Sequence, residues 1–213
     1  GLLKNPRLGY DGVKAMRENT SLPVTVKIRS GWDAGSINYR ETADAAVQAG
    51  ASLVCLHART RSQGYSGSAA WEHIRDLKTV SPVPVFGSGD LFTPEDVVRM
   101  LGETGCDGVM LARGAIGNPF IFRETAGMLS SGSCAKPSPE GRVRAGLEHL
   151  RRAAALKGEK AACREMRKHF AAYVKGIPCS ARFRGLIVHA ETVEEYLRIT
   201  EDFIRSLGET PRA

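Results

Sequence analysis

The chain has 213 residues, of which 42% are hydrophobic and 25% are charged, a balance typical of a globular protein with a sizeable core. No apolar run approaches the roughly 18 residues needed to cross a bilayer, which argues against a membrane-spanning segment. The formal net charge of +7 favours an acidic partner, most commonly nucleic acid. On charge alone, a merely solvated basic surface is the alternative.

The chain begins at Gly1 rather than at methionine, and no basic segment is followed by an apolar one. We therefore expect no secretory signal, and we interpret the start as an interior cut of a longer chain or as a processed terminus. No two of the five cysteines form a C-x-x-C pair, which predicts free thiols in a reducing, cytoplasmic compartment. No cluster of residues has metal-ligand spacing, so no metal is expected.

Four short apolar runs rich in β-branched residues predict buried strands, each ending in polar or glycine-rich residues. They cover residues 24–29, 53–59, 83–90 and 108–114. Polar groups at the carboxyl ends of parallel strands are where a (β/α) barrel keeps its chemistry, and loops after its last strands often hold phosphate. The pattern predicts a phosphate-bearing cofactor or substrate at one rim of the sheet.

Segments with the apolar spacing of helices separate these strands. The predicted helices cover residues 5–19, 39–49, 71–80 and 93–101. Gly50 is a candidate C-cap of the second helix, and Thr93 with Pro94 begins the fourth with a capping hydroxyl and a proline in the first turn. Regular alternation of helices and strands predicts an α/β fold with a parallel sheet.

Four β/α units in about 120 residues amount to half of a complete barrel, which takes about 250 residues. The predicted fold is therefore the C-terminal half of a TIM (β/α)8 barrel followed by a small all-α domain. The alternative is a small open doubly wound sheet. Such sheets usually hold phosphate after the first strand, whereas the glycine-rich loops here follow the last two, which favours the barrel.

A boundary is indicated by a stretch rich in Ser, Gly and Pro, which is typical of a linker. We assign residues 1–128 to the partial barrel, 129–139 to the linker and 140–213 to the helical domain. Within this last domain three helices are predicted, over residues 140–157, 159–175 and 191–207.

Two side chains at predicted strand ends are candidate site residues. Lys27 could neutralise an anionic ring or a phosphate, or could be a lysine reaching to solvent from the barrel mouth. His57 alone is more often a structural histidine, but Arg59 and Arg61 in the adjoining loop suit phosphate or RNA backbone. The alternative for these arginines is simple solvation.

The loops at residues 87–90 and 112–114 are compact enough to aim backbone N–H groups at a phosphate. Either loop alone could be only a tight turn that needs glycine. Their occurrence on two successive strands favours binding. The sequence has no Walker loop and no G-x-G-x-x-G, and no Ser/His/Asp set occupies successive strand ends.

Several motifs in this order closely resemble the tRNA-dihydrouridine synthases, bacterial B-type branch, and the resemblance covers nearly the whole chain. In the first part they are VTVKIRSGW at 24–32, HARTR at 57–61, GSGD at 87–90 and MLARGAIGNP at 110–119. In the helical part they are MRKH at 166–169, YVKGIP at 173–178 and SARFR at 180–184.

The resemblance implies an FMN-dependent (β/α)8 barrel with a helical tRNA-binding domain, in which NADPH recharges the flavin. The family reduces the C5–C6 double bond of a tRNA uridine, which must leave the stack to reach the flavin. By motif, the implied cofactor-binding residues are Lys27, His57, Ser88, Gly89, Asp90, Ala112, Arg113 and Gly114. The implied RNA-binding residues are Arg59, Arg61, Arg164, Arg167, Lys168, Lys175, Arg182 and Arg184.

The chain departs from the family pattern at a few positions. Ser88 stands where the family usually has Asn, Ala70 where an acid is common, and Ala172 where an aromatic residue is frequent. The family's proton-donor cysteine belongs to an N-x-G-C-P-like motif that would precede Gly1, and none of the five cysteines is equivalent to it. We therefore expect no catalytic residue in this chain, and expect the chain alone to be inactive.

Two other functions stay open at this point. One is a non-catalytic tRNA-binding module that keeps the basic helical domain without the catalytic half. The other is an FMN barrel oxidoreductase that acts on a small molecule, which the basic helical tail argues against.

Overall fold

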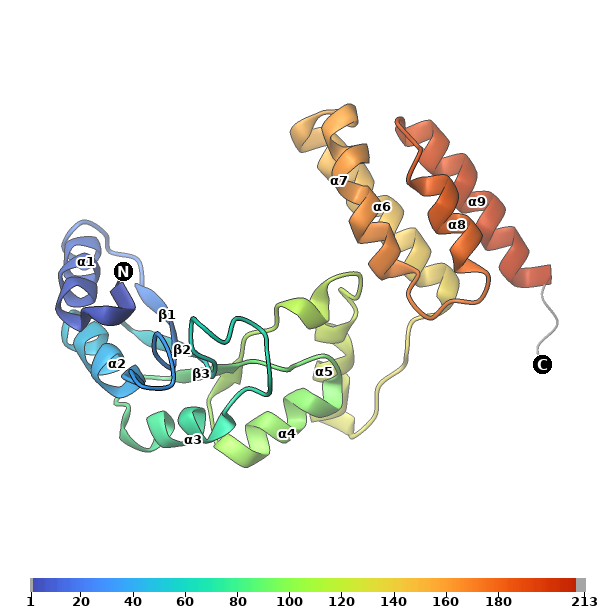
Figure 1. The fold of residues 1–213 in the computed structure, drawn as a ribbon. Coiled ribbons are helices and arrows are strands. Elements are labelled where there is room, and N and C mark those ends of the chain that lie inside the picture. The colour runs from blue at the N-terminus through green and yellow to red at the C-terminus, as the bar shows by residue number, and fades with distance from the viewer. Residues whose placement is uncertain (1, 210–213) are drawn as a thin grey trace. The chain divides into compact units, whose positions relative to one another are not determined.

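The computed structural model describes residues 2–209 and divides into two compact units (Figure 1). The first unit comprises Gly1–Gly114 with Met128–Ser130, and the second comprises Ala115–Gly127 with Ser131–Ala213. Among the described residues, no helix combines the length and apolar character needed to cross a membrane.

A four-stranded parallel sheet forms the centre of the first unit. Its strands are β1 (Thr25–Arg29), β2 (Leu53–His57), β3 (Val85–Ser88) and β4 (Gly108–Val109). They are hydrogen-bonded in the order β1-β2-β3-β4, with every neighbouring pair parallel. The predicted parallel sheet of an α/β fold is confirmed, although each strand is shorter than predicted and β4 is reduced to two residues.

One helix precedes the first strand and three lie between successive strands along the chain, and the helices cover one face of the sheet (Figure 1). They are α1 (Pro6–Glu18), α2 (Tyr39–Gln48), α3 (Trp71–Val80) and α4 (Pro94–Thr104), with short 3-10 turns η1 (Leu2–Lys4) and η2 (Arg113–Ala115). All four predicted helices are present. Thr93 and Asp96 form the capping box of α4, and Gly105 ends this helix in the left-handed conformation.

The strand register separates the sheet into two chemically different faces. Ile28 pairs with Leu56, and both side chains belong to the buried core beneath the helices. Neighbouring residues alternate between faces, so Arg29, His57 and Ser88, which pair across β1, β2 and β3, share the opposite face. The polar residues predicted at the strand ends therefore meet on the face that the helices leave open.

Close packing of helices on the sheet explains one of the glycines. A Cβ atom on Gly87 would lie 2.6 Å from Met100 Sδ and 3.2 Å from Ile74 Cδ1. Both of these side chains come from the covering helices and are fully buried. Glycine at this position lets α3 and α4 approach the sheet directly before Ser88, the last residue of β3.

The second unit is built from helices, with α5 (Ile121–Ser131) preceding a four-helix assembly. These four helices are α6 (Pro139–Lys157), α7 (Glu159–Tyr173), α8 (Ser180–Ile187) and α9 (Val193–Glu209). Three of the four match predicted helices, whereas α5 and α8 were not predicted. Helix α5 continues to Ser131, inside the stretch that was expected to be the linker. Residues 115–127, which were assigned to the partial barrel, group with the second unit.

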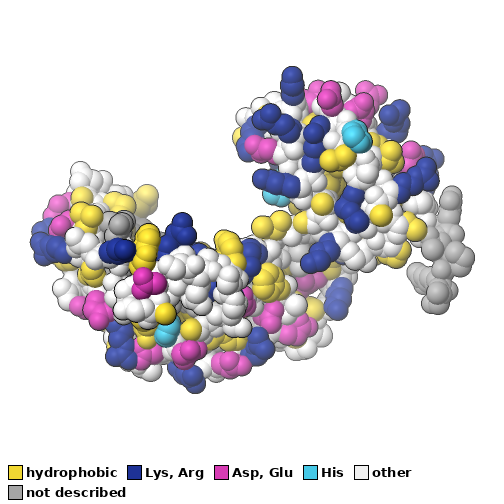
Figure 2. Space-filling model, viewed as in Figure 1, with side chains coloured by type: hydrophobic (Ala, Val, Ile, Leu, Met, Phe, Trp, Pro, Cys, Tyr) yellow, Lys and Arg dark blue, Asp and Glu magenta, His cyan; other side chains and the backbone are white. Residues whose placement is uncertain are grey.

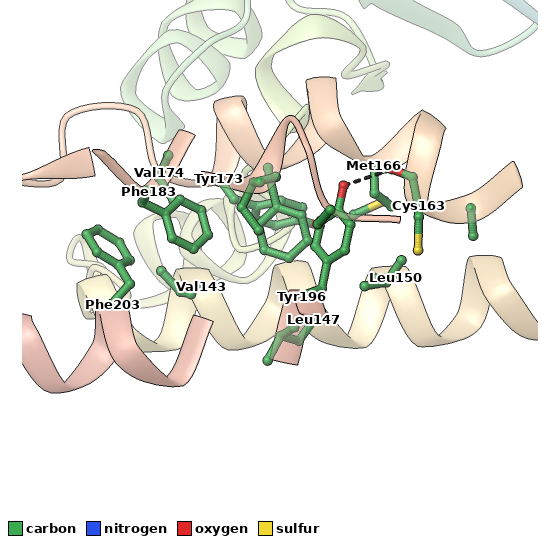
Figure 3. Packing of buried hydrophobic residues seen from close by; sticks show 14 of the residues in the cluster. Val143, Leu147, Leu150, Cys163, Met166, Tyr173, Val174, Phe183, Tyr196 and Phe203 are labelled. Atoms are coloured by element: carbon green, nitrogen blue, oxygen red, sulfur yellow. Dashed lines mark hydrogen bonds between the residues drawn. The ribbon is translucent and has the colours of Figure 1, made fainter. Parts of the chain in front are cut away.

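An aromatic core holds α6 to α9 together (Figure 3). The Phe183 and Phe203 rings stack with centroids 4.6 Å apart, joining α8 to α9. The Tyr196 hydroxyl donates a 2.8 Å hydrogen bond to the Cys163 carbonyl oxygen, and burial raises the pKa of Tyr196 to about 12. The tyrosine thus keeps its proton and ties α9 to α7.

Candidate functional site

The carboxyl ends of the strands form a cleft of about 190 Å³ in the first unit. Lys27 lies on the same face as Arg29, two residues earlier on β1, and the register brings His57 beside Arg29. Of the predicted cofactor-binding residues, those lining the cleft are Lys27, His57, Ser88, Gly89, Asp90, Ala112 and Arg113. The other lining residues, which were not among the predicted cofactor-binding residues, are Arg29, Tyr65, Leu91, Phe92 and Met110.

Positive charge dominates this cleft. Lys27, Arg29 and Arg113 are opposed by one carboxylate, that of Asp90. Burial, and then the charges of Arg29 and Lys27, lower the pKa of His57 to about 4, so its imidazole is neutral near pH 7. A cationic cleft with a neutral histidine suits an anionic ligand that also needs a hydrogen-bonding partner.

Acid should therefore destabilise the protein through His57. Its folded-state pKa of about 4 lies below the usual 6.5, so the unfolded chain takes up the proton first. This contribution to stability is complete above pH 6.5 and is lost as the pH falls toward 4. We expect the urea midpoint of a His57→Gln variant to fall less between pH 7 and pH 4 than that of wild type. The exposed His189→Gln is the control, and identical pH profiles for wild type and His57→Gln would contradict this prediction.

The loop after β3 has a backbone conformation that few residues other than glycine adopt. Gly89 has a φ of +125°, and a Cβ atom there would lie 2.7 Å from Ala69 Cβ. Asp90 also has a positive φ, of +57°. Ser88, which precedes Gly89, donates its hydroxyl proton to the Met110 carbonyl oxygen at 3.0 Å. Because its proton is used in this bond, Ser88 offers a ligand an acceptor oxygen rather than a hydrogen-bond donor.

Arg59, one of the predicted RNA-binding residues, lies in a buried environment rather than on the surface. Its side chain is only 2% exposed, and its Nη2 donates to Asp90 Oδ2 at 2.7 Å and to the Gly67 carbonyl oxygen at 2.6 Å. Its guanidinium is enclosed by protein, and the predicted contact of Arg59 with RNA stays a prediction. Arg61, by contrast, is exposed as expected.

Asp90 is the acceptor around which the rim of the cleft is organised. Besides Arg59, its carboxylate accepts from the Ala69 amide at 2.8 Å and from Arg113 Nη2 at 3.3 Å. Burial alone would raise the pKa of Asp90, but these three donors outweigh it and hold the pKa below its usual value. Asp90 therefore stays ionised and orients Arg113, instead of facing an anion itself.

Gly114, the remaining predicted cofactor-binding residue, does not line the cleft. A Cβ atom there would lie 2.1 Å from the Leu91 carbonyl oxygen. Glycine thus allows the turn η2 to approach the segment after β3, and the role of Gly114 is to bring Arg113 and Phe92 to the same rim.

In the second unit, a cavity of about 590 Å³ lies at the turn from α6 to α7. Arg164 and Arg167, both predicted to bind RNA, line it together with Lys157 and Lys160, which were not predicted. Arg167 is half-buried and its Nη2 donates to the Ala190 carbonyl oxygen at 3.4 Å. Figure 2 shows Lys and Arg side chains gathered over this unit. The other predicted RNA-binding residues here are exposed but lie outside this cavity: Lys168, Lys175, Arg182 and Arg184.

The cysteines offer no acid group to the cleft. Cys55 is 1% exposed, burial raises the pKa of its thiol, and its Sγ contacts Met110 Sδ at 3.7 Å. All five cysteines are free thiols. Within residues 2–209, no group of three or more His, Cys, Asp or Glu side chains could hold a metal ion.

Comparison with known proteins gives consistent matches. The family model for dihydrouridine synthase (Dus) matches residues 1–207. A "Probable tRNA-dihydrouridine synthase" of Treponema pallidum is 41% identical over 97% of this chain and 64% of the relative. The "Probable tRNA-dihydrouridine synthase 1" of Synechocystis is 38% identical, over 91% of this chain and 55% of the relative. "tRNA-dihydrouridine synthase B" of Xanthomonas axonopodis pv. citri is 36% identical, over 97% and 62%.

The chain thus spans less than two thirds of the length of these curated relatives, at 64%, 55% and 62%. The family match extends across the sheet, the cleft and nearly all of the helical unit. The resemblance inferred from the motifs is confirmed, and the chain belongs to the dihydrouridine synthase family.

Proposed function

We propose that this protein, as its gene encodes it, is an FMN-dependent tRNA-dihydrouridine synthase that reduces the C5–C6 double bond of a uridine in tRNA with NADPH. The observation that carries the proposal is the cationic cleft, because residues from four strand ends converge there in a family member. The proposed site of action is the cytoplasm, where tRNA and free thiols occur together.

The residues of the cleft fit the phosphate-bearing end of FMN. Arg113 supplies a guanidinium, and the positive φ of Gly89 with its crowded surroundings lets the backbone pass close to a ligand. Lys27, exposed on the open face of β1, would lie against the anionic part of the flavin ring. The bound flavin would supply hydride to the uridine ring. The chain's own contributions are to hold the phosphate, to balance negative charge with Lys27, and to offer the neutral imidazole of His57.

The fold that we propose for the whole protein is a TIM barrel, of which this sheet is half. The sequential order β1-β2-β3-β4 supports a barrel, because doubly wound sheets reverse their order at a switch point. Lys27 and Met110 are exposed on the open face of the sheet, which would be the inside of the barrel. Ile28 and Leu56 are buried on the face that the helices cover. The cleft, at about 190 Å³, is smaller than the roughly 300 Å³ of the smallest usual ligand pockets, as expected if further strands complete it. We keep the predicted domain limits, 1–128, 129–139 and 140–213, as a proposal, with the end of α5 at Ser131 inside the linker.

Flavin content tests the cofactor assignment. We expect Lys27→Ala to lower FMN affinity about tenfold to a hundredfold, because a hydrogen bond to a charged group contributes about 1.5–3 kcal/mol. The measurement is FMN titration of the purified protein. Lys14→Ala, an exposed lysine on α1, is the control and should bind FMN normally. Unchanged FMN affinity and unchanged activity in Lys27→Ala would show that the cofactor assignment is wrong.

The basic cavity at the α6–α7 turn supports tRNA as the partner of the second unit. Four cationic side chains line it, opposed by Glu159 and Glu191. We expect tRNA affinity to fall steeply with salt, and Lys160→Gln with Arg164→Gln to flatten the log–log slope by about 0.7 to 0.9 for each phosphate that is no longer neutralised. Arg152→Gln, exposed and paired with Glu148, is the control. An unchanged slope in the double variant would place the RNA elsewhere.

The same cavity also fits the second candidate, a tRNA-binding module without redox activity. That candidate predicts salt-sensitive retention of tRNA by a protein that binds no flavin. Absence of any tRNA binding would instead favour an FMN oxidoreductase acting on a small molecule.

A further inference from the structure

The guanidinium of Arg113 lies over two aromatic rings at the mouth of the cleft. Its Cζ is 4.2 Å from the centroid of the Tyr65 ring and 5.1 Å from that of Phe92. These rings are 61% and 46% exposed, respectively, so neither of them serves as a core residue. Both line the cleft beside Arg113. Large rings held in solvent next to one cation indicate that their contact with that cation is their role.

A carboxylate restrains the same guanidinium. Arg113 Nη2 lies 3.3 Å from Asp90 Oδ1, and Asp90 is itself fixed by Arg59 Nη2 at 2.7 Å. Stacking on rings leaves the N–H donors of a guanidinium at its edges. Only one of those edges is paired with Asp90. The remaining donors belong to a side chain that is 35% exposed and lines the cleft.

The loop that carries Tyr65 is anchored on both sides of the tyrosine. Gly64 and Gly67 flank it with φ values of +59° and +61°. Arg29 Nη1 donates to the Gly64 carbonyl oxygen at 3.3 Å, and Arg59 Nη2 donates to the Gly67 carbonyl oxygen at 2.6 Å. The position of the Tyr65 ring over Arg113 is therefore set by the half-buried Arg29 of β1 and by the buried Arg59 just after β2.

We propose that Tyr65 and Phe92 are positioning residues, which hold the guanidinium of Arg113 edge-on toward a phosphate group in the cleft. This deepens the proposed function and rests on it, since the phosphate expected there is that of FMN. An RNA phosphate would present the same chemistry. Holding the guanidinium in place before the ligand arrives reduces the conformational entropy lost on binding.

Comparison of FMN with riboflavin isolates the phosphate contribution. In the protein as its gene encodes it, Tyr65→Leu and Phe92→Leu should each lower FMN affinity about twofold to fivefold and leave riboflavin affinity unchanged, given the usual size of cation–π contacts at exposed sites. Tyr65→Phe keeps the ring and should bind FMN as wild type does. Combining Tyr65→Leu with Arg113→Gln should add little to the loss caused by Arg113→Gln alone.

Matched controls lie away from the cleft. Tyr10→Leu removes a ring that lies under Arg7 at 4.8 Å, and Phe122→Leu removes a ring that is 57% exposed; neither should change FMN affinity. Equal losses of FMN and riboflavin, or full additivity with Arg113→Gln, would overturn the proposal. A loss confined to tRNA binding would support the positioning role with an RNA phosphate as the ligand.

The proposed function and the positioning role can fail separately. If wild type bound neither flavin, the proposed cofactor would be wrong. The positioning role would then be decided by titration with inorganic phosphate, in which weaker binding by Tyr65→Leu supports it and equal binding by wild type and Tyr65→Leu overturns it.

Discussion

Replacement of Gly117 by alanine is expected to lower the free energy of unfolding by about 3 kcal/mol, the combined effect of backbone strain and overpacking. Gly117 has a φ of +69°, which alanine adopts only with strain. A Cβ atom there would lie 2.5 Å from the Ala172 carbonyl carbon and 2.7 Å from the Tyr173 backbone nitrogen. These are backbone atoms at the end of α7, so they cannot move aside as a flexible side chain could.

A control variant separates the effect of crowding against α7 from the effect of backbone strain. Gly176 has a similar φ of +76°, but a Cβ atom on Gly176 would have no neighbouring atom within 4 Å. We expect Gly176→Ala to cost about 1 kcal/mol, the strain alone. Urea unfolding of both variants gives the measurement. Equal losses of stability in the two variants would show that Gly117 does not pack tightly against α7.

Replacement of Arg59 by methionine is expected to destabilise the protein by about 3 kcal/mol, as removal of one partner from a buried ion pair does. Methionine would leave the Asp90 carboxylate without its strongest partner and the Ser66 and Gly67 carbonyl oxygens without their donor. The loop that these carbonyls belong to should become more susceptible to protease. Thermal unfolding and limited proteolysis measure the two effects.

Arg61→Met is the matched control, because Arg61 lies two residues further along the same loop and is exposed. Its effect on stability should stay within about 0.5 kcal/mol, as for most surface substitutions. Arg59→Met combined with Asp90→Asn should be less destabilised than Arg59→Met alone, since the half-buried carboxylate that has lost its partner is then removed too. A neutral Arg59→Met would contradict the structural role that we assign to this arginine.

Local patterns were sufficient to predict most elements of the first unit. The predicted helix at 71–80 matches α3, and the capping residues at Thr93 and Gly105 mark the two ends of α4. Strand limits were less accurate, because β4 ends at Val109 although apolar residues continue to Leu111. Hydrogen bonding to a neighbour, which the sequence does not reveal, determines where a strand ends.

Helix α8 was missed because its sequence lacks the usual starting signals. It follows Pro178 and begins after Cys179, which has a φ of +57° and makes no side-chain cap. The resemblance implied RNA binding for Arg182 and Arg184, but no helix was predicted at these residues. Packing of Phe183 into the aromatic core supplies the stability that local sequence does not.

The candidate site was predictable in outline only. Residues at strand ends, such as Lys27 and His57, could be located because parallel strands bring their carboxyl ends together. Burial of Arg59 could not be predicted, since an arginine after a strand is equally compatible with a solvated or an enclosed side chain. Tyr65 was missed as a contact of Arg113 because the two residues are far apart in sequence, and only the folded loop brings them together.

Formation of dihydrouridine is the most direct test of the central claim. Unmodified tRNA transcripts would be incubated with the protein as its gene encodes it, FMN and NADPH, and digested for mass spectrometry of the nucleosides. We predict a uridine that gains two hydrogen atoms, and about tenfold to a hundredfold less product when Lys27→Ala replaces the wild-type protein at limiting FMN. A wild-type protein that binds FMN and tRNA yet leaves every uridine unreduced would contradict the proposed function.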